Sequence, residues 1–199
     1  MGIYDSARAK TKRSITETFW NLYLQKDISK ITVRDITEGT GIHRATFYLY
    51  YDNVFAVLDS IKQEQLDKLG EVCSTYASAE NDYADFLGAM RKLYDENEIF
   101  LKPLLCQYRG NEFAAQYRQI MKNKLRNDIG WQQYPDGSTP FLVVDSVLSG
   151  LIEIFISFLQ TRAFSLESAY KFASYSVDHG LAPAMEHEFG ISLLPEKSD

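Results

Sequence analysis

Apolar residues recur with helical spacing along almost every long segment of this 199-residue chain. Between residues 11 and 25, for example, Ile15, Phe19 and Leu22 fall on one face of a helix. A half-buried strand would need apolar and polar residues in alternation, and no segment of any length shows that pattern. The sequence therefore predicts an all-α protein. Further helices are expected at about 81–95, 97–108, 111–128, 140–162 and 166–187. Pro183 should bend or end the last of them.

Two short helices joined by a tight turn are expected between residues 32 and 51. Thr32 is a good N-cap for the first helix, and Asp35 at its third position completes a weaker form of the capping box. Glycines at 39 and 41 mark the turn, in which we expect only Gly41 to be strictly required, where the two backbones approach. This is the layout of a helix-turn-helix. The long fourth helix that follows has an apolar side formed by Val54, Val57, Leu58, Ile61, Leu66 and Leu69.

The side chains of the two short helices separate into an inner and an outer set. Ile36, Ile42 and Phe47 can pack inward, and Tyr51 is expected to join them. The outer set is Arg34, His43, Arg44, Thr46, Tyr48 and Tyr50. Arginine can bond guanine O6 and N7 together, and threonine and tyrosine hydroxyls can donate to phosphates. The outer set therefore suits double-stranded DNA, although an ordinary helical hairpin with a polar face has the same pattern.

Basic residues are concentrated at the N-terminal end of an acidic chain. The formal net charge is -6, yet residues 1–52 carry eight Lys/Arg against six Asp/Glu. The first fourteen residues hold Arg8, Lys10, Lys12 and Arg13 against Asp5 alone, which predicts a basic arm. A polyanion would therefore meet the chain at this end.

The stretch TVRDITEGTGIHRATFYLYYDNVFAVLDSI resembles the N-terminal domain of the TetR family of bacterial transcriptional regulators, and the resemblance covers about residues 11–62. The matching elements are Thr32, Ile36, Gly41, Ile42, Thr46, Phe47, Tyr48, Tyr50 and Tyr51. The resemblance implies base contacts for Arg34 and Arg44. It also implies phosphate contacts for Thr46, Tyr48 and Tyr50, and a cap that can bind phosphate for Thr32.

Three residues depart from the family pattern. Val54 stands where the family usually has a lysine that caps the fourth helix and contacts backbone phosphate. Thr37 replaces the usual alanine, and Asp27 replaces a common glycine. Loss of the lysine should weaken phosphate binding and lower the slope of its salt dependence by about one unit. The basic arm, Lys10 to Arg13, could compensate.

The resemblance implies a helix-turn-helix DNA-binding domain at residues 1–53 and a helical regulatory and dimerisation domain at residues 54–199. The last two long helices would pair with their mates in a four-helix bundle. Apolar faces that could form it hold Val144, Val147, Leu148, Leu151, Phe155, Phe158, Leu159, Ala169, Phe172, Ala173 and Val177, with small residues beside them. The alternative is that both faces pack inside one monomer. A homodimer would bind an inverted repeat, because such dimers contact half-sites about 34–36 Å apart, or farther on a longer operator.

The resemblance also implies a small-molecule effector of unidentified chemistry. Aromatic and methionine side chains of the larger domain could line its pocket. The candidates are Phe86, Met90, Tyr94, Phe100, Tyr108, Phe113, Tyr117 and Met121, with Leu104 and Trp131 beside them. Their helical spacing is equally typical of a plain core. Arg91, Arg109 and Arg118 could meet an acidic ligand or simply face solvent.

Other chemistries find less support. His179 and His187 lie eight residues apart, whereas metal ligands on one helix prefer spacings of about three or four, so no metal is expected. Neither an enzyme nor a cofactor is expected, because the chain has no Ser-His-Asp arrangement, P-loop or dinucleotide motif. Cys73 and Cys106 are interpreted as a reduced cytosolic pair, with redox sensing as the alternative.

The most apolar stretch, residues 141–159, is interrupted by polar side chains, so a buried helix is expected there and not a membrane span. The N-terminus lacks the apolar core of a signal peptide, and a cytoplasmic protein is expected. Two functional hypotheses remain. The first is a DNA-binding repressor released by an effector. The second is a co-activator or interaction protein of similar build, with weak DNA binding, that acts through a protein partner.

Overall fold

The computed structural model describes residues 3–76, 83–106, 111–128, 137–161, 165–176, 179–180 and 182–190. Within these ranges all regular secondary structure is helical, so the predicted all-α class is confirmed. The chain divides into two compact units, Met1–Gln65 and Leu66–Asp199. No helix in the described ranges combines the length and apolarity that crossing a membrane requires.

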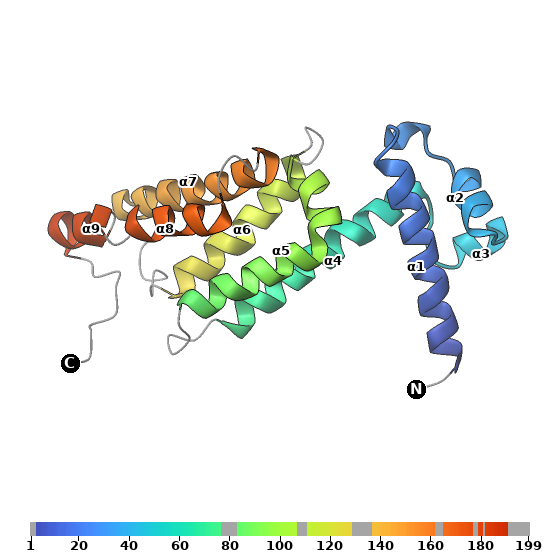
Figure 1. Ribbon diagram of the computed structural model, residues 1–199, viewed down its shortest axis with the longest axis horizontal. Coiled ribbons are helices and arrows are strands. Elements are labelled where there is room, and N and C mark those ends of the chain that lie inside the picture. Colours follow the sequence, from blue (N-terminus) through green and yellow to red (C-terminus); the bar gives the residue numbers. More distant parts are fainter. Residues whose placement is uncertain are drawn as a thin grey trace. The chain divides into compact units, whose positions relative to one another are not determined.

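In the first unit, α1 (Ile3–Tyr23) leads through a short 3-10 turn, η1 (Ile28–Lys30), into α2 (Val33–Thr40) and α3 (Arg44–Tyr48). α1 packs against α2, and α2 packs against α3 (Figure 1). The long helix α4 (Val54–Thr75) begins in this unit. The largest fully buried side chains of the unit are Ile15, Phe19, Trp20, Ile36 and Phe47. These side chains give the short helices α2 and α3 an apolar core that neither could form alone.

The first helix begins well before the position that its apolar face indicates. The sequence predicts a start near residue 11, whereas α1 begins at Ile3. Arg8 and the run from Lys10 to Arg13 therefore belong to a helix and do not form a separate arm. Alanine, lysine and arginine have high helix propensities, so this segment extends the helix beyond its buried part.

The two glycines of the turn are required for different reasons. Gly41 has φ 72°, the left-handed conformation that ends α2, and a Cβ placed there would meet nothing within 4 Å. A Cβ at Gly39, in contrast, would lie 2.6 Å from Thr18 Cγ2 of α1. The expectation that only Gly41 is strictly required is therefore wrong. The close approach is between α1 and α2 at Gly39, and Gly41 supplies the backbone conformation.

The second unit contains α5 (Tyr83–Cys106), α6 (Asn111–Asp128), α7 (Thr139–Thr161), α8 (Leu166–Ser176) and α9 (Ala182–Phe189). α5 packs against α6 and α7, and α7 also packs against α6 and α8 (Figure 1). The predicted apolar side of α4 is buried throughout, in both the part that belongs to the first unit and the part that belongs to the second.

One helix prediction for this unit is wrong. The segments 81–95 and 97–108 form one helix, because Asn97 donates its side-chain amide to the Leu93 carbonyl within α5 and does not cap a new helix. The helix expected at 166–187 is described as α8, which ends at Ser176, and α9, which begins at Ala182, and residues 177–178 and 181 between them lie outside the described ranges. Pro183 lies in the first turn of α9, where its missing N–H costs no helical hydrogen bond.

Buried polar groups join the helices of the second unit. Lys68 Nζ of α4 donates to Asn97 Oδ1 of α5 at 2.9 Å. Lys124 of α6 is only 5% exposed, and its ammonium donates to the Tyr76 carbonyl at 2.6 Å. The same ammonium lies 4.9 Å from the centre of the Phe86 ring. These contacts offset the cost of removing a lysine from water.

Candidate DNA-binding surface

The short helices α2 and α3 have one apolar and one polar side. Ile36 and Phe47 are completely buried and Tyr51 is 6% exposed, which confirms their predicted inward orientation. Ile42 is only half-buried. The residues predicted to contact DNA include five exposed ones (Thr32, Arg34, His43, Arg44 and Tyr48) and two half-buried ones (Thr46 and Tyr50). They lie on α2 and α3 or within two residues of the ends of these helices.

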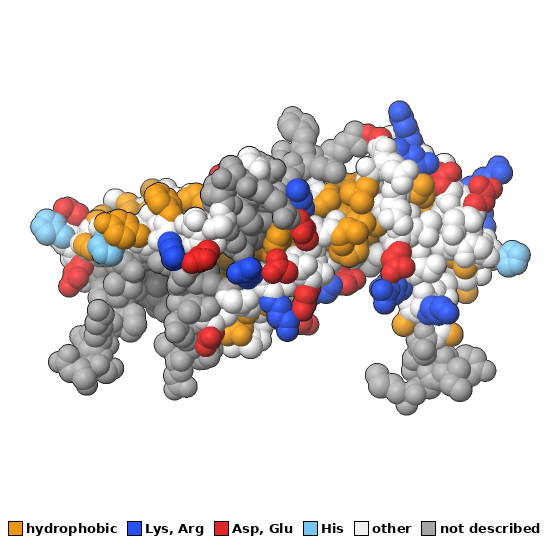
Figure 2. Space-filling model, viewed as in Figure 1, with side chains coloured by type: hydrophobic (Ala, Val, Ile, Leu, Met, Phe, Trp, Pro, Cys, Tyr) orange, Lys and Arg blue, Asp and Glu red, His pale blue; other side chains and the backbone are white. Residues whose placement is uncertain are grey.

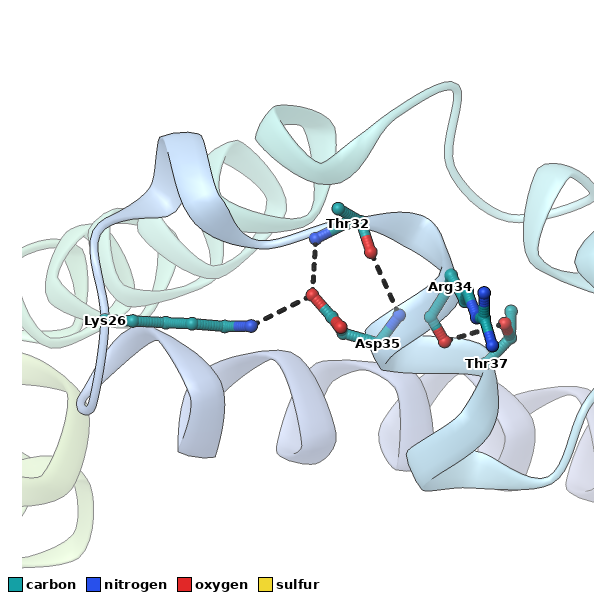
Figure 3. Close-up of polar contacts among 5 residues, drawn as sticks. All are labelled: Lys26, Thr32, Arg34, Asp35 and Thr37. Atoms are coloured by element: carbon teal, nitrogen blue, oxygen red, sulfur yellow. Dashed lines mark hydrogen bonds and ion pairs between the residues drawn. The ribbon is translucent and has the colours of Figure 1, made fainter.

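Asp35 organises the first turn of α2. Its carboxylate accepts the Thr32 backbone N–H at 2.9 Å, and the Thr32 hydroxyl accepts the Asp35 N–H at 3.2 Å, which confirms the capping box (Figure 3). Lys26 donates to the same carboxylate at 2.9 Å from the segment that follows α1. The Thr32 N–H, and after it Lys26, lower the pKa of Asp35. The start of α2 is therefore fixed both to its own cap and to the preceding loop.

Arg34 does not extend alone from α2. Its Nε donates to Glu38 Oε1 at 2.7 Å, and this hydrogen bond raises the pKa of the Arg34 guanidinium. The pair is well exposed, with side-chain exposures of 82% and 62%, so it is weak and can be replaced by other partners. Glu38 was not among the predicted site residues. Its spacing of four from Arg34 on a helix is the signal that indicates the pair.

Arg44 is held by an aromatic residue. Its Nε and Nη2 both donate to the Tyr48 hydroxyl oxygen, at 3.3 and 3.0 Å. The guanidinium carbon lies 5.5 Å from the centre of the Tyr48 ring. That ring in turn meets the buried Phe47 ring edge-on, with centroids 5.6 Å apart. A series of contacts thus connects an exposed arginine to the core of the unit.

The N-terminal part of α1 reaches the end of the same surface. The Arg8 guanidinium carbon lies 5.9 Å from the centre of the Tyr50 ring. Tyr51, the residue after Tyr50, also contacts α1, because its hydroxyl and that of Thr16 are hydrogen-bonded at 3.4 Å. Arg13, in contrast, is paired with Glu17 at 2.7 Å. Among the basic residues expected in an arm, Arg8 is therefore the one with a described contact to a predicted site residue.

The structure also explains Val54, the main departure from the family pattern. Val54 is 6% exposed, so its side chain belongs to the core. Asn53 caps α4 instead, because its Oδ1 accepts the Ala56 N–H at 3.0 Å. A valine at this position contributes packing and offers no charge to a phosphate. On the face drawn in Figure 2, basic and acidic side chains alternate over the described helices, with no extended basic area.

The described residues among those considered for an effector pocket lie on α5 and α6. Phe86, Met90, Tyr94, Phe113 and Tyr117 are buried. Phe100 and Met121 are half-buried, and Tyr108 lies outside the described residues. Burial raises the pKa of the Tyr117 phenol, with Cys73 close by. Such packing is what a helical core requires, and a pocket among these residues stays a prediction.

Several other predicted residues have local partners. Arg91 pairs with Asp95 at 3.6 Å and Arg118 with Glu153 at 2.8 Å, whereas Arg109 lies outside the described ranges. The His179 ring stacks on Tyr175, with centroids 4.1 Å apart. His187 is hydrogen-bonded to Glu188. Among the described residues, no group of three or more His, Cys, Asp or Glu side chains could hold a metal ion.

The predicted dimer faces are only partly described. The side chains of Val144, Leu148, Leu151, Phe155, Phe158, Leu159, Ala169, Ala173 and Val177 lie outside the described set. Leu142 of α7 and Phe172 and Tyr175 of α8 are 55%, 60% and 64% exposed. Cys73 is buried, and the side chain of Cys106 is not described.

Comparison with known proteins gives one limited similarity. No family model matches the chain. Over 67 residues the chain is 28% identical to an uncharacterized HTH-type transcriptional regulator, YxbF, of Bacillus subtilis (strain 168). The matching region covers 34% of this chain and 17% of that protein's length. The similarity supports a DNA-binding regulator of transcription, and it does not reach the level of a particular family.

Proposed function

We propose that this chain is a TetR-like DNA-binding transcriptional regulator, a cytoplasmic homodimeric repressor that a small-molecule effector releases from DNA. The observation that carries the proposal is the two-sided character of α3. Phe47 is completely buried, whereas Arg44 and Tyr48 are exposed. A helix held from behind by an aromatic residue, with an arginine and hydroxyls in front, has what contact with a major groove requires.

In this proposal, residues 1–53 bind DNA and residues 54–199 receive the effector and form the dimer. Arg34 and Arg44 would meet base edges, and His43 would lie on the surface offered to DNA. Thr32, Thr46, Tyr48 and Tyr50 would meet phosphates, which position the protein without reading sequence. Arg8 beside the Tyr50 ring supplies a positive charge that Val54 does not.

Exposed apolar side chains support the dimer. Leu142, Phe172 and Tyr175 are each more than half exposed on α7 and α8, and a second copy would remove them from water. The two copies would present their α3 helices to an inverted repeat. The buried aromatic side chains of α5 and α6 are the proposed surroundings of the effector. An effector that binds the DNA-incompetent arrangement more tightly would shift the dimer toward it.

The test is a selection of binding sites from randomised duplex DNA at two salt concentrations, repeated with a cell extract present. We expect a selected inverted repeat, weaker binding at higher salt, and release by a metabolite in the extract. Failure to select any inverted repeat, even at low salt, would exclude the repressor. If a site is selected but no extract releases the protein, only the effector part of the proposal fails.

A second candidate function is an interaction protein with weak DNA binding that works through a protein partner. Two observations favour it. Val54 is buried where a phosphate-binding lysine would be expected, and Arg34 is already paired with Glu38. The same selection separates the candidates, because an interaction protein would enrich no sequence. A partner retained from the extract by the immobilised chain would then support the second function.

A further inference from the structure

We infer that Tyr48 is a positioning residue for Arg44, and that its hydroxyl aims the guanidinium at a guanine. The inference rests on the proposed DNA-binding function and goes beyond the phosphate contact expected for this tyrosine. Both residues lie on α3, four positions apart, where side chains of a helix become neighbours.

The hydrogen bonds define which edge of the guanidinium Tyr48 occupies. An arginine has one edge formed by Nε and an Nη nitrogen, and an end formed by both Nη nitrogens. The Tyr48 oxygen accepts from Nε at 3.3 Å and from Nη2 at 3.0 Å, so it occupies the first edge. The end with two Nη nitrogens keeps the pair of donors that matches guanine O6 and N7.

The tyrosine is itself held in place. Its ring meets the buried Phe47 ring edge-on at 86°, and the Arg44 guanidinium also lies over the Tyr48 ring. The aromatic contact therefore limits the motion of the hydroxyl, and the hydroxyl limits that of the arginine. Pre-orientation of this kind reduces the ordering cost that a long side chain pays on binding.

A comparison with Arg34 shows why the phenol suits this role. Arg34 uses the same nitrogen, Nε, to bind Glu38 at 2.7 Å. A carboxylate partner cancels the arginine's charge and repels the DNA backbone. A neutral phenol fixes the direction of Arg44 and leaves its full charge for DNA.

The experiment uses the full chain and the duplex selected by the wild-type protein. The guanine read by Arg44 is first identified as the base that the wild-type protein distinguishes and the Arg44→Ala variant does not. A second duplex carries adenine in place of this guanine. Tyr48→Phe keeps the ring and removes only the hydroxyl, and Tyr50→Phe is the control at a half-buried tyrosine that is proposed to contact phosphate. We expect Tyr48→Phe to reduce the discrimination between the two duplexes by roughly 2- to 10-fold, the equivalent of one net hydrogen bond. Tyr50→Phe should weaken binding to both duplexes equally and leave this ratio unchanged, because a phosphate contact does not read sequence.

The same variants are then measured in an Arg44→Ala background. If Tyr48 acts through Arg44, the effect of Tyr48→Phe on discrimination disappears there. An equal loss of affinity for both duplexes, undiminished when Arg44 is absent, would mean an independent phosphate contact and would overturn the inference. If the wild-type protein selects no sequence, the proposed function fails and the inference falls with it.

A readout without DNA separates these failures further. In ¹⁵N NMR of the free protein, the Arg44 Nε–H should exchange with water more slowly than that of an unpaired arginine. Tyr48→Phe should speed this exchange several-fold, as expected when a hydrogen bond is removed. An unchanged exchange rate would show that the hydroxyl does not hold the guanidinium in solution, and would refute the positioning role.

Discussion

α2 and α3 are neighbouring short helices of one unit that are fixed by different physical means. α2 begins at a complete capping box, with Asp35 also bound to Lys26, and ends at a left-handed Gly41. The His43 side chain makes no capping hydrogen bond at the start of α3. That helix is instead held by Phe47, which is completely buried, and by Tyr51 behind it. Polar contacts therefore define α2, whereas aromatic burial defines α3.

The difference predicts how each helix responds to change. Charge-assisted hydrogen bonds depend on pH and salt, whereas aromatic burial depends on neither directly. α2 should therefore loosen in acid before α3 does. The comparison also extends to the exposed arginines, since the partner of Arg34 is a carboxylate and that of Arg44 is a phenol.

The largest effect is expected at the core of α3. Phe47→Ala should lower the free energy of unfolding by about 3–5 kcal/mol, because it removes a fully buried ring and leaves a cavity. Urea denaturation measures the change. Leu49→Ala is the control, because Leu49 is 74% exposed and should change stability little. Equal effects of the two substitutions would contradict the claim that α3 is held from behind by Phe47.

Arg44→Ala tests the exposed side of α3. We expect a loss of about 1–3 kcal/mol in discrimination between the selected duplex and one with a changed guanine, the usual value of a bidentate arginine–guanine pair. Dissociation constants for both duplexes give this quantity. Arg91→Ala, an exposed arginine of α5 paired with Asp95, is the control. An unchanged site preference in Arg44→Ala would refute the role assigned to Arg44.

Gly39→Ala tests the contact of α2 with α1. The added methyl group would lie 2.6 Å from Thr18 Cγ2, and such overpacking should destabilise the protein by about 1–3 kcal/mol. Adding Thr18→Ser, which removes that methyl group, should restore most of the loss. Gly88→Ala in α5 is a matched control, because nothing lies within 4 Å of its Cβ position. If Thr18→Ser does not restore the stability lost in Gly39→Ala, the loss does not come from this contact.

Asp35→Ala removes the polar start of α2. Loss of a cap contact of this kind typically costs about 1 kcal/mol. The folded-state pKa of Asp35 is lowered, so its contribution is present above the unfolded-state pKa and is lost as the pH falls through the folded-state value. The stability difference between wild type and variant, measured by denaturation, should therefore be constant near neutral pH and shrink below about pH 4. A difference that persists in strong acid would assign the loss to packing.

The smallest effect is expected at Glu38. Glu38→Gln should strengthen DNA binding by only about 2- to 3-fold, because an exposed ion pair is weak, while making the salt dependence steeper by up to about one unit. A salt titration of the dissociation constant measures both. Glu96→Gln, on the exposed face of α5 beside Lys92, is the control. Weaker binding in Glu38→Gln would mean that the carboxylate positions Arg34 and does not compete with DNA.

The features that the sequence predicts correctly depend on residues close together in the chain. Thr32 and Asp35 are three apart, and Phe47 belongs to an apolar pattern within a few residues, so local rules suffice for both. Lys26 joins Asp35 from a loop, and Thr18 meets Gly39 from another helix. Contacts of this kind depend on how the helices pack, and the spacing of apolar residues along the chain does not predict that packing.

Two features of the second unit also differ from what local sequence patterns predict. The break expected between residues 95 and 97 does not occur, because no glycine or proline stands at that point and Asn97 bonds back to the Leu93 carbonyl. The buried Lys124 was not predicted as an interior residue. Its position depends on the carbonyl of Tyr76, 48 residues away in sequence.

The burial of Val54 restricts how the chain could be changed to bind DNA more tightly. Replacing this valine with the lysine that the family resemblance suggests would place an ammonium group in the core, where desolvation costs several kcal/mol unless a partner is present. A single mutation at this position would therefore exchange stability for charge. The adjacent Phe55 is 56% exposed, so a lysine there could remain hydrated. A lysine would therefore cost less stability at position 55 than at position 54.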